Sequence, residues 1–266
     1  MRKIKLTGGE PLARKDCAWL AGQLKAIPGI EKVTLTTNGI LLSEQLGALK
    51  EAGIDAINIS LDTLDPELFR QITRRDSLDK VLEGLEAALA CPGLSVKVNC
   101  VPAVKKKENF AAMAGLAKKY PLHVRFIEMM PIGYGKKFPF QDEESIKAVL
   151  EEAYGSMTLI EERFGNGPCH YYKIEGFQGK IGFISAVTHK FCSQCNRVRL
   201  TAEGYLKGCL QFQEGTDLRA LLRGGCSDME LREAIRTVIW EKPVSHNFYE
   251  TQTEQDEVRA MSQIGG

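Results

Sequence analysis

Three cysteines late in the sequence have a spacing that suits metal chemistry. Cys192 and Cys195 form a C-x-x-C pair, and Cys209 follows in the segment CSQCNRVRLTAEGYLKGC. Three thiolates suit a cubane iron–sulfur cluster in which one iron lacks a cysteine ligand, because soft sulfur ligands favour such clusters. Zinc is the alternative, with His189 or Cys226 completing a tetrahedron. The spacing alone leaves both metals open.

The cysteine content as a whole argues against disulfides. The sequence has 8 cysteines in 266 residues, too few for a secreted disulfide scaffold, and a cytosolic setting would keep them reduced. A redox role for the C-x-x-C pair fits less well, because no thioredoxin-like strand and helix flank it. The cysteines outside the late segment are expected to be small buried hydrophobic residues: Cys17, Cys91, Cys100, Cys169 and Cys226.

Two arginines lie among the late cysteines. Arg197 and Arg199 are two positions apart in a segment that resembles a strand, so their side chains are expected on the same side. Planar guanidinium groups bind phosphate through paired, charge-assisted hydrogen bonds. The pair would therefore form a fork for an anion beside the cysteines. A pair of solvated arginines on a strand is the alternative.

The elements that must position these residues follow an alternating pattern. Over the first ~150 residues, short β-rich runs alternate with amphipathic helical stretches, which is typical of βα units around a parallel sheet. Ser43 is expected to cap one helix and Gly53 to end it. Five strands are expected: Lys3–Thr7, Val33–Thr37, Ala56–Leu61, Val96–Val101 and Val124–Met129.

The pattern changes at Met157. From there, strand-like runs alternate with glycine-rich turns, and two helices are expected near residues 218–222 and 228–241. We therefore expect a barrel-like part over residues 1–155 and an extension over residues 156–266, which ends in Gly265 and Gly266.

Polar residues gather where the expected strands end. The turn TGGEP at residues 7–11 has two glycines that let a backbone approach a ligand, although a tight turn between strand and helix accounts for it equally well. Ligands of parallel α/β folds bind at the carboxyl ends of strands. The residues near those ends that could line such a site are Thr36, Asn38, Ser60, Asp62, Asn99 and Met130.

Two lysines lie inside expected strands. If Lys5 and Lys97 pointed inward they would need an anionic partner, because a buried unpaired charge is costly. The alternative is that both point outward to solvent between helices.

The overall charge excludes some classes of partner. With 35 Lys and Arg against 34 Asp and Glu, the net charge is +1, so neither nucleic acid nor a membrane surface is expected to bind. No apolar run approaches the ~20 residues of a spanning helix, and the start MRKIKLTGGE is not a signal peptide. We expect a cytoplasmic protein.

Several of these segments together carry a family resemblance. KIKLTGGEPL, TTNG, NISLDTL, RFIEMMPIG and FCSQCNRVRLTAEGYLKGCL resemble the GTP 3',8-cyclases (molybdopterin precursor Z synthases), radical S-adenosylmethionine (SAM) enzymes that start molybdenum cofactor biosynthesis. The resemblance runs across essentially the whole chain. It implies an α/β fold, an incomplete (βα)6 radical SAM barrel with a carboxyl-terminal α+β extension, and it favours a [4Fe–4S] cluster over zinc in that extension.

The resemblance also assigns residues. It makes Cys192, Cys195 and Cys209 ligands of a [4Fe–4S] cluster whose open iron faces the guanine base. The residues that would contact SAM are Gly9, Ser60 and Met130. Those that would contact GTP are Lys5, Thr36, Lys97, Arg197, Val198 and Arg199. No residue is assigned as catalytic.

The implied reaction is a radical cyclisation of GTP. Such enzymes cleave SAM reductively at a first cluster, and the resulting radical takes hydrogen from the ribose 3' position before that carbon attacks guanine C8. The family holds this first cluster with a C-x3-C-x2-C motif ahead of GGEP, and the sequence contains no such motif. We therefore expect a barrel without its first βα unit, one cluster, and no activity from the chain alone.

Other functions stay open on this evidence. One is a GTP- or SAM-binding iron–sulfur protein without radical activity, and another is a peptide-modifying radical SAM enzyme with an auxiliary cluster. The arginines at 197 and 199 favour the nucleotide. The resemblance further implies an electron donor as partner and allows a homodimer.

Overall fold

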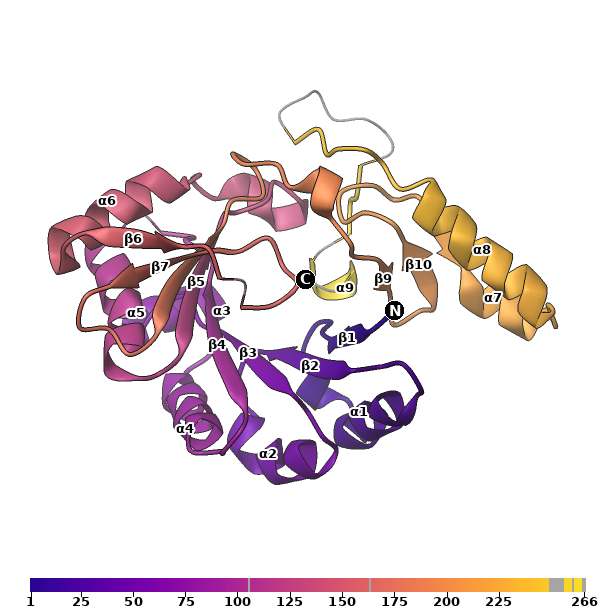
Figure 1. Ribbon diagram of the computed structural model, residues 1–266, viewed down its shortest axis with the longest axis horizontal. Helices are drawn as coiled ribbons and strands as arrows, with labels where there is room; N and C mark the ends of the chain where they lie inside the picture. The colour runs from indigo at the N-terminus through magenta and orange to yellow at the C-terminus, as the bar shows by residue number, and fades with distance from the viewer. Residues whose placement is uncertain (105, 163, 249–255, 260, 265–266) are drawn as a thin grey trace. The chain divides into compact units, whose positions relative to one another are not determined.

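The computed structural model describes residues 1–104, 106–162, 164–248, 256–259 and 261–264 (Figure 1). The chain forms two compact units. The first consists of Met1–Met129 and Pro139–Ser185, and the second of Met130–Phe138 and Ala186–Gly266. Each unit has its own sheet, so each is described separately.

The first unit is built on an eight-stranded sheet with the order β1-β2-β3-β4-β5-β8-β7-β6. Strands β1 to β5 and β8 pair in parallel, whereas β7 pairs antiparallel with both β8 and β6. The strands span Lys3–Leu6 (β1), Lys32–Thr37 (β2), Ala56–Ser60 (β3), Ser95–Cys100 (β4), His123–Ile127 (β5), Met157–Ile160 (β6), His170–Ile174 (β7) and Lys180–Ile184 (β8). The five expected strands are confirmed, with ends that differ by one or two residues.

Helices connect the parallel strands. They span Pro11–Ala13 (η1), Cys17–Ala26 (α1), Leu42–Glu51 (α2), Pro66–Thr73 (α3), Leu78–Leu89 (α4), Lys107–Lys119 (α5) and Glu143–Tyr154 (α6). The start of α3 shows how the sequence sets a boundary: Asp65 accepts hydrogen bonds from the backbone N–H groups of Glu67 and Leu68, and Pro66 occupies the first helical position.

One helix begins differently from the expectation but ends as expected. Helix α2 begins at Leu42 with Leu41 as its N-cap, which makes no side-chain cap bond, so Ser43 lies inside the helix and its expected capping role is wrong. Gly53 directly follows the C-cap residue Ala52 with φ +79°, so its role in ending the helix is confirmed.

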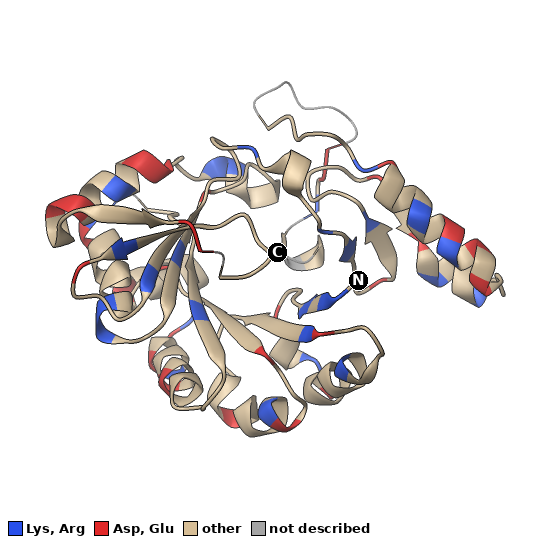
Figure 2. Cartoon of the chain, in the orientation of Figure 1, with Lys and Arg blue, Asp and Glu red and all other residues tan. Residues whose placement is uncertain are grey.

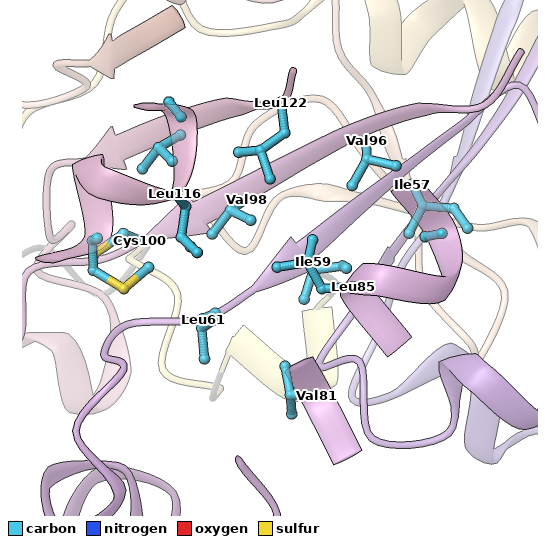
Figure 3. Packing of buried hydrophobic residues seen from close by; sticks show 14 of the residues in the cluster. Ile57, Ile59, Leu61, Val81, Leu85, Val96, Val98, Cys100, Leu116 and Leu122 are labelled. Atoms are coloured by element: carbon cyan, nitrogen blue, oxygen red, sulfur yellow. The ribbon is translucent and has the colours of Figure 1, made fainter. Parts of the chain in front are cut away.

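The core of the first unit lies between the sheet and these helices (Figure 3). Ile57 and Ile59 alternate along β3, are fully buried, and belong to the same apolar cluster as Val81 and Leu85 of α4. Burial of one such side chain contributes about 1.5–3 kcal/mol. Because successive strand residues point to opposite faces, Asn58 lies on the other face of the sheet.

The second unit contains a small antiparallel sheet of order β11-β10-β9. Its helix α8 begins with a capping box, in which the side chains of Ser227 and Glu230 satisfy backbone N–H groups reciprocally. Its elements are Gly133–Lys137 (η2), Cys192–Gln194 (η3), Arg199–Leu200 (β9), Tyr205–Lys207 (β10), Gly215–Asp217 (β11), Leu218–Arg223 (α7), Asp228–Trp240 (α8) and Met261–Ile264 (α9). The two expected helices are thus confirmed as α7 and α8.

The boundary between the compact units differs from the expected division at residue 155. Strands β6, β7 and β8 belong to the sheet of the first unit, because β8 pairs in parallel with β5 over His123–Ile127. The change from helical to strand-like sequence therefore marks a change from parallel to antiparallel pairing within one sheet, in which only β7 runs opposite to the other strands. In the described residues no helix is long and apolar enough to cross a membrane.

Candidate functional site

A hydrogen-bonded chain of polar side chains crosses four strands of the first unit. Asn58 donates to the Thr36 hydroxyl over 3.2 Å. Arg125 donates through Nη2 to Asn58 Oδ1 at 2.7 Å and through Nε to Asn99 Oδ1 at 2.9 Å. These bonds bring Thr36 and Asn99, two of the residues expected near strand ends, into one network with Arg125 at its centre.

The side chain of Lys97 points to the interior of the first unit, and its ammonium donates hydrogen bonds to other residues of the protein. Its Nζ donates to the backbone carbonyl of Phe164 at 2.5 Å and to the Tyr171 hydroxyl at 3.3 Å. Burial, and then the nearby charge of Arg125, lowers the pKa of Lys97 to about 8. An outward, solvated Lys97 is therefore wrong, and an anion that approached this amine would compete with a carbonyl.

Several neighbouring strands carry lysines or arginines (Figure 2), and the strand register puts Lys3, Lys97 and Arg125 on the same face of the sheet. Burial lowers the pKa of Lys3, and the charges of Lys32 and Arg125 lower it further. Lys5, two residues along β1 from Lys3, is exposed. Mutual repulsion among cations is relieved when an anion binds between them, so this face favours a phosphate-bearing ligand.

The TGGEP turn ties the ends of two strands together. Glu10 accepts hydrogen bonds from the Thr37 hydroxyl and the Asn38 N–H, both at 2.7 Å, and from the Leu12 N–H at 2.9 Å. Gly8 has φ +142°, a conformation that side-chain-bearing residues rarely adopt, and Gly9 is exposed. The backbone of Gly9 is thus accessible at a strand end, as its expected role requires.

A second carboxylate joins the ends of β3 and β4. Asp62 accepts a hydrogen bond from the Val101 N–H at 2.7 Å, and its backbone carbonyl accepts one from Asn109 at 2.8 Å. Burial raises the pKa of Asp62 to about 6, and the Val101 hydrogen bond opposes this shift. Ser60, at the end of β3, remains exposed. Asp62 therefore supports the rim on which Ser60 lies.

The second unit holds the three late cysteines as free, half-buried thiols. Cys192 begins the single turn η3 and Cys195 is its C-cap, donating its N–H to the Cys192 carbonyl at 3.0 Å. Burial raises the pKa of Cys195, but hydrogen bonds from the Arg197 N–H and Lys242 outweigh burial, so the pKa is lowered. A lowered pKa favours the thiolate, which is the metal-binding form.

The two arginines lie near these thiols. Burial and the charge of Arg197 lower the pKa of Arg199, whereas Cys195 and Cys209 raise it. Strand β9 begins only at Arg199, so the alternation of side chains along a strand does not place Arg197 on the same side as Arg199. The guanidinium of Arg197 lies 5.3 Å from the centre of the Phe191 ring. The strand geometry therefore does not support the expected fork, although the charge of Arg197 acts on Arg199.

Val198, between the arginines, faces away from any polar ligand. Its side chain packs against the cluster of Leu206, Leu218 and Val238. A contact between Val198 and a nucleotide would consequently use its backbone groups.

The three cysteines can be compared with what a single ion and a cluster require. Within the described residues, no three side chains of His, Cys, Asp and Glu are close enough together to hold one metal ion, and this includes Cys192, Cys195 and Cys209. In a cubane each cysteine ligates a different iron, and the thiolates need not converge on one point. Three half-buried thiols near two arginines fit that arrangement.

The remaining expected positions are divided between the units. Gly9 and Ser60 belong to the first, whereas Met130 belongs to the second and packs against Ile132 and Leu210. The expectation for the other cysteines is confirmed for Cys17 and Cys100, which are buried, and is wrong for Cys91, Cys169 and Cys226, which are half-buried. Gly265 and Gly266 lie outside the described residues.

Sequence reasoning missed two residues. Arg125 alternates with the buried Val124 and Phe126, so the period-two pattern of VRFIEM could have placed it on the polar face. Lys242 gives no such signal, because it follows the end of α8 in a loop and contacts Cys195, which lies far earlier in the chain.

Comparisons with known proteins identify the family of the chain. The model of the radical SAM superfamily matches residues 1–102, and the model described as Molybdenum Cofactor Synthesis C matches residues 122–248. A GTP 3',8-cyclase of Clostridium perfringens (strain SM101 / Type A) is 44% identical over 267 residues, covering 100% of this chain and 82% of that protein. One of Syntrophomonas wolfei (strain DSM 2245B / Goettingen) is 43% identical over 270 residues, with the same coverage.

Among solved structures, a domain of the pyruvate-formate lyase-activating enzyme of Bacteroides vulgatus ATCC 8482 has a TM-score of 0.46 at 13% identity, covering 68% of this chain and 99% of that one. The sheet of parallel strands and the superfamily match define a radical SAM protein. Membership implies a [4Fe–4S] cluster and SAM. The identity to curated relatives over the full chain is more specific: the chain belongs to the GTP 3',8-cyclase family.

Proposed function

We propose that the reaction in which this chain takes part is the conversion of GTP to (8S)-3',8-cyclo-7,8-dihydroguanosine 5'-triphosphate by SAM-derived radical chemistry, the first step of molybdenum cofactor biosynthesis. The chain alone is expected to be inactive, because its sequence contains no C-x3-C-x2-C motif. The observation that supports this substrate best is the gathering of Arg197 and Arg199 near the thiols of Cys195 and Cys209. Arginines beside a cluster suit a nucleotide that carries both a base and a triphosphate.

The proposed residues divide by ligand. We assign Cys192, Cys195 and Cys209 to the cluster, and Gly9, Ser60 and Met130 to SAM. The GTP residues would be Lys5, Thr36, Lys97, Arg197, Val198 and Arg199. When bound, the cluster would offer guanine an iron without a cysteine ligand. The chain's own groups would neutralise the triphosphate and fix the ribose and base in place, because the cofactor carries the radical chemistry.

Lys97 would change partner when GTP binds. Its ammonium donates to the Phe164 carbonyl, and the pKa near 8 leaves part of the amine neutral around pH 8. A phosphate would replace the carbonyl and raise the pKa of Lys97, so GTP binding to this side chain would take up a proton. We further propose a cytoplasmic protein that receives an electron from a donor and functions as a homodimer.

Iron content tests the cluster assignment. Anaerobic reconstitution is expected to load about four irons and four sulfides per chain, because one cysteine triad holds one cubane. Cys195→Ala should abolish loading, whereas Cys91→Ala, at a half-buried thiol of the first unit, should not. Stoichiometric zinc in place of iron, or a full cluster in Cys195→Ala, would contradict the assignment.

Binding, not turnover, tests the substrate, because the sequence contains no C-x3-C-x2-C motif. Calorimetry with GTP is expected to show that Arg197→Ala and Arg199→Ala each weaken binding by ~1.5–3 kcal/mol, the range for a charge-assisted hydrogen bond. This corresponds to roughly 10- to 150-fold in the dissociation constant. Arg223→Ala, an exposed charge at the end of α7, is the control. Parent-like GTP affinity in both variants would show that the pair does not bind nucleotide.

A further inference from the structure

A lysine just beyond helix α8 is bonded to the cysteine turn. Lys242 Nζ lies 3.3 Å from Cys195 Sγ, 2.6 Å from the Cys195 carbonyl oxygen and 2.8 Å from the Arg197 carbonyl oxygen. An ammonium has three N–H donors, and three acceptors surround this one. The half-buried side chain is therefore held in one orientation, with one donor directed at a sulfur.

A backbone donor from the same segment reaches a second cysteine. The His246 N–H lies 3.4 Å from Cys192 Sγ. The position of this N–H is fixed by the His246 ring, which is buried, lies 2.6 Å from the Ala186 carbonyl oxygen through Nε2, and stacks on Phe248 with ring centres 4.3 Å apart. Two of the three thiols thus have an N–H donor from residues 242–246.

The third cysteine follows a residue that contacts the same segment. Gly208 immediately precedes Cys209, and a Cβ added at Gly208 would lie 2.9 Å from the Val238 carbonyl oxygen and 3.6 Å from Lys242 Cα. This packing leaves no room for a side chain at position 208. The chain beside Cys209 is consequently held against the end of α8 and the backbone of Lys242.

We propose that residues 242–246 form the hydrogen-bonding support of the cluster, with Lys242 as the positioning residue that raises its reduction potential. This inference rests on the proposed ligands Cys192, Cys195 and Cys209. Hydrogen bonds to ligand sulfurs and nearby positive charge stabilise the reduced cluster, which carries one more negative charge, relative to the oxidised one. Lys242 supplies both effects at Cys195.

A purely structural tether would behave differently. If Lys242 mattered only through its bonds to the Cys195 and Arg197 carbonyls, its removal would loosen the turn without a systematic change in potential. If the proposal is right, the potential follows the charge and the N–H donor at position 242. A redox titration therefore separates the two roles.

The experiment compares variants of the reconstituted chain. Lys242→Met removes charge and donor, and is expected to lower the one-electron reduction equilibrium constant about tenfold, which is about 59 mV. Lys242→Arg keeps both and should remain within about threefold of the parent, or about 30 mV. Arg236→Met, which removes an exposed charge on α8 that is paired with Glu233, is the matched control and should not shift the potential.

The readouts are dye-mediated titration followed by electron paramagnetic resonance, with iron content measured on each sample. A loaded Lys242→Met variant with the parent potential would overturn the proposal and leave the ligand assignment intact. If Lys242→Met does not retain the cluster, Lys242→Gln is the second variant, because it keeps an N–H donor without the charge. Its iron content is expected to lie between those of the Met and Arg variants, and its reduction potential below that of the parent. A parent-like potential in Lys242→Gln would overturn the proposal. A parent chain that binds no iron would overturn the ligand assignment and this inference together.

Discussion

Replacing Glu257 with Gln is expected to destabilise the second unit by about 3–5 kcal/mol, the cost of leaving a buried charge without its partner. The side chains of Glu257 and Lys207 form an ion pair and are both 0% exposed. Burial lowers the pKa of Lys207, and Glu257 opposes that shift. Without the carboxylate, the Lys207 ammonium stays in an interior that disfavours its charge.

The reverse change should cost less, because Glu257 has other donors. Arg259 donates to it through Nε and Nη2, both at 2.9 Å, and through its backbone N–H at 3.0 Å. Lys207→Met removes one charged hydrogen bond and fills most of the space of the lysine stem, so about 1–3 kcal/mol is expected. Glu233→Gln, in the exposed pair with Arg236, should change stability by less than about 1 kcal/mol.

Hydrogen exchange measured by mass spectrometry gives the free energy of opening for peptides that cover β10 and β11, where Lys207 lies. The pH dependence adds a second check. Burial raises the pKa of Glu257, but Arg259 and Lys207 outweigh burial and hold it at about 2, below the ordinary 4.5. This stabilisation should be present above pH 4.5 and lost as the pH falls toward 2. Equal costs for Glu257→Gln and Lys207→Met would refute the reasoning.

Two further changes test the first unit. Burial raises the pKa of Asp62 to about 6, so the contribution of the protonated carboxyl to stability is complete below pH 3.8 and is lost as the pH rises through 6. In urea titrations, Asp62→Asn should therefore raise the free energy of unfolding at pH 8 and leave it unchanged near pH 4. Gly84→Ala would place a Cβ 2.9 Å from the Gly39 carbonyl oxygen, where α4 meets α2. It should lower the free energy of unfolding by about 1–3 kcal/mol in the same assay. Gly47→Ala is the control, because open space surrounds that position, and it should be neutral or stabilising.

The sequence predicted best those features that depend on local patterns. Strand β3 is predictable because Ile57 and Ile59 alternate with period two. Helix α4 is one of the amphipathic stretches expected between the strands, because its apolar residues recur with helical spacing. The cysteine segment is recognisable for a related reason, since its three cysteines lie within one short stretch. Ser43 failed as a cap because the N-cap of the helix is Leu41, two residues earlier, and a cap assignment depends on that single position.

Features that depend on distant contacts could not be predicted. Lys97 is bonded to the carbonyl of Phe164 and Lys242 to Cys195, and neither pairing has a periodic or spacing signal. The joining of β8 to β5 is of the same kind, because a parallel pairing is specified by the connection and the packing and not by the strand itself. These contacts appear only when the chain is folded.

The support for the three cysteines also has a consequence for the order of biosynthesis. A ribosome adds residues from the amino terminus, so Cys192, Cys195 and Cys209 emerge before Lys242 and His246, which donate hydrogen bonds to two of the thiols. A nascent chain from which residue 209 has emerged, but residue 242 has not, exposes all three thiols without these donors. Iron delivered at that stage would meet an unsupported and oxidisable triad, so maturation of the proposed cluster is expected to follow the release of helix α8 and residues 242–246 from the ribosome.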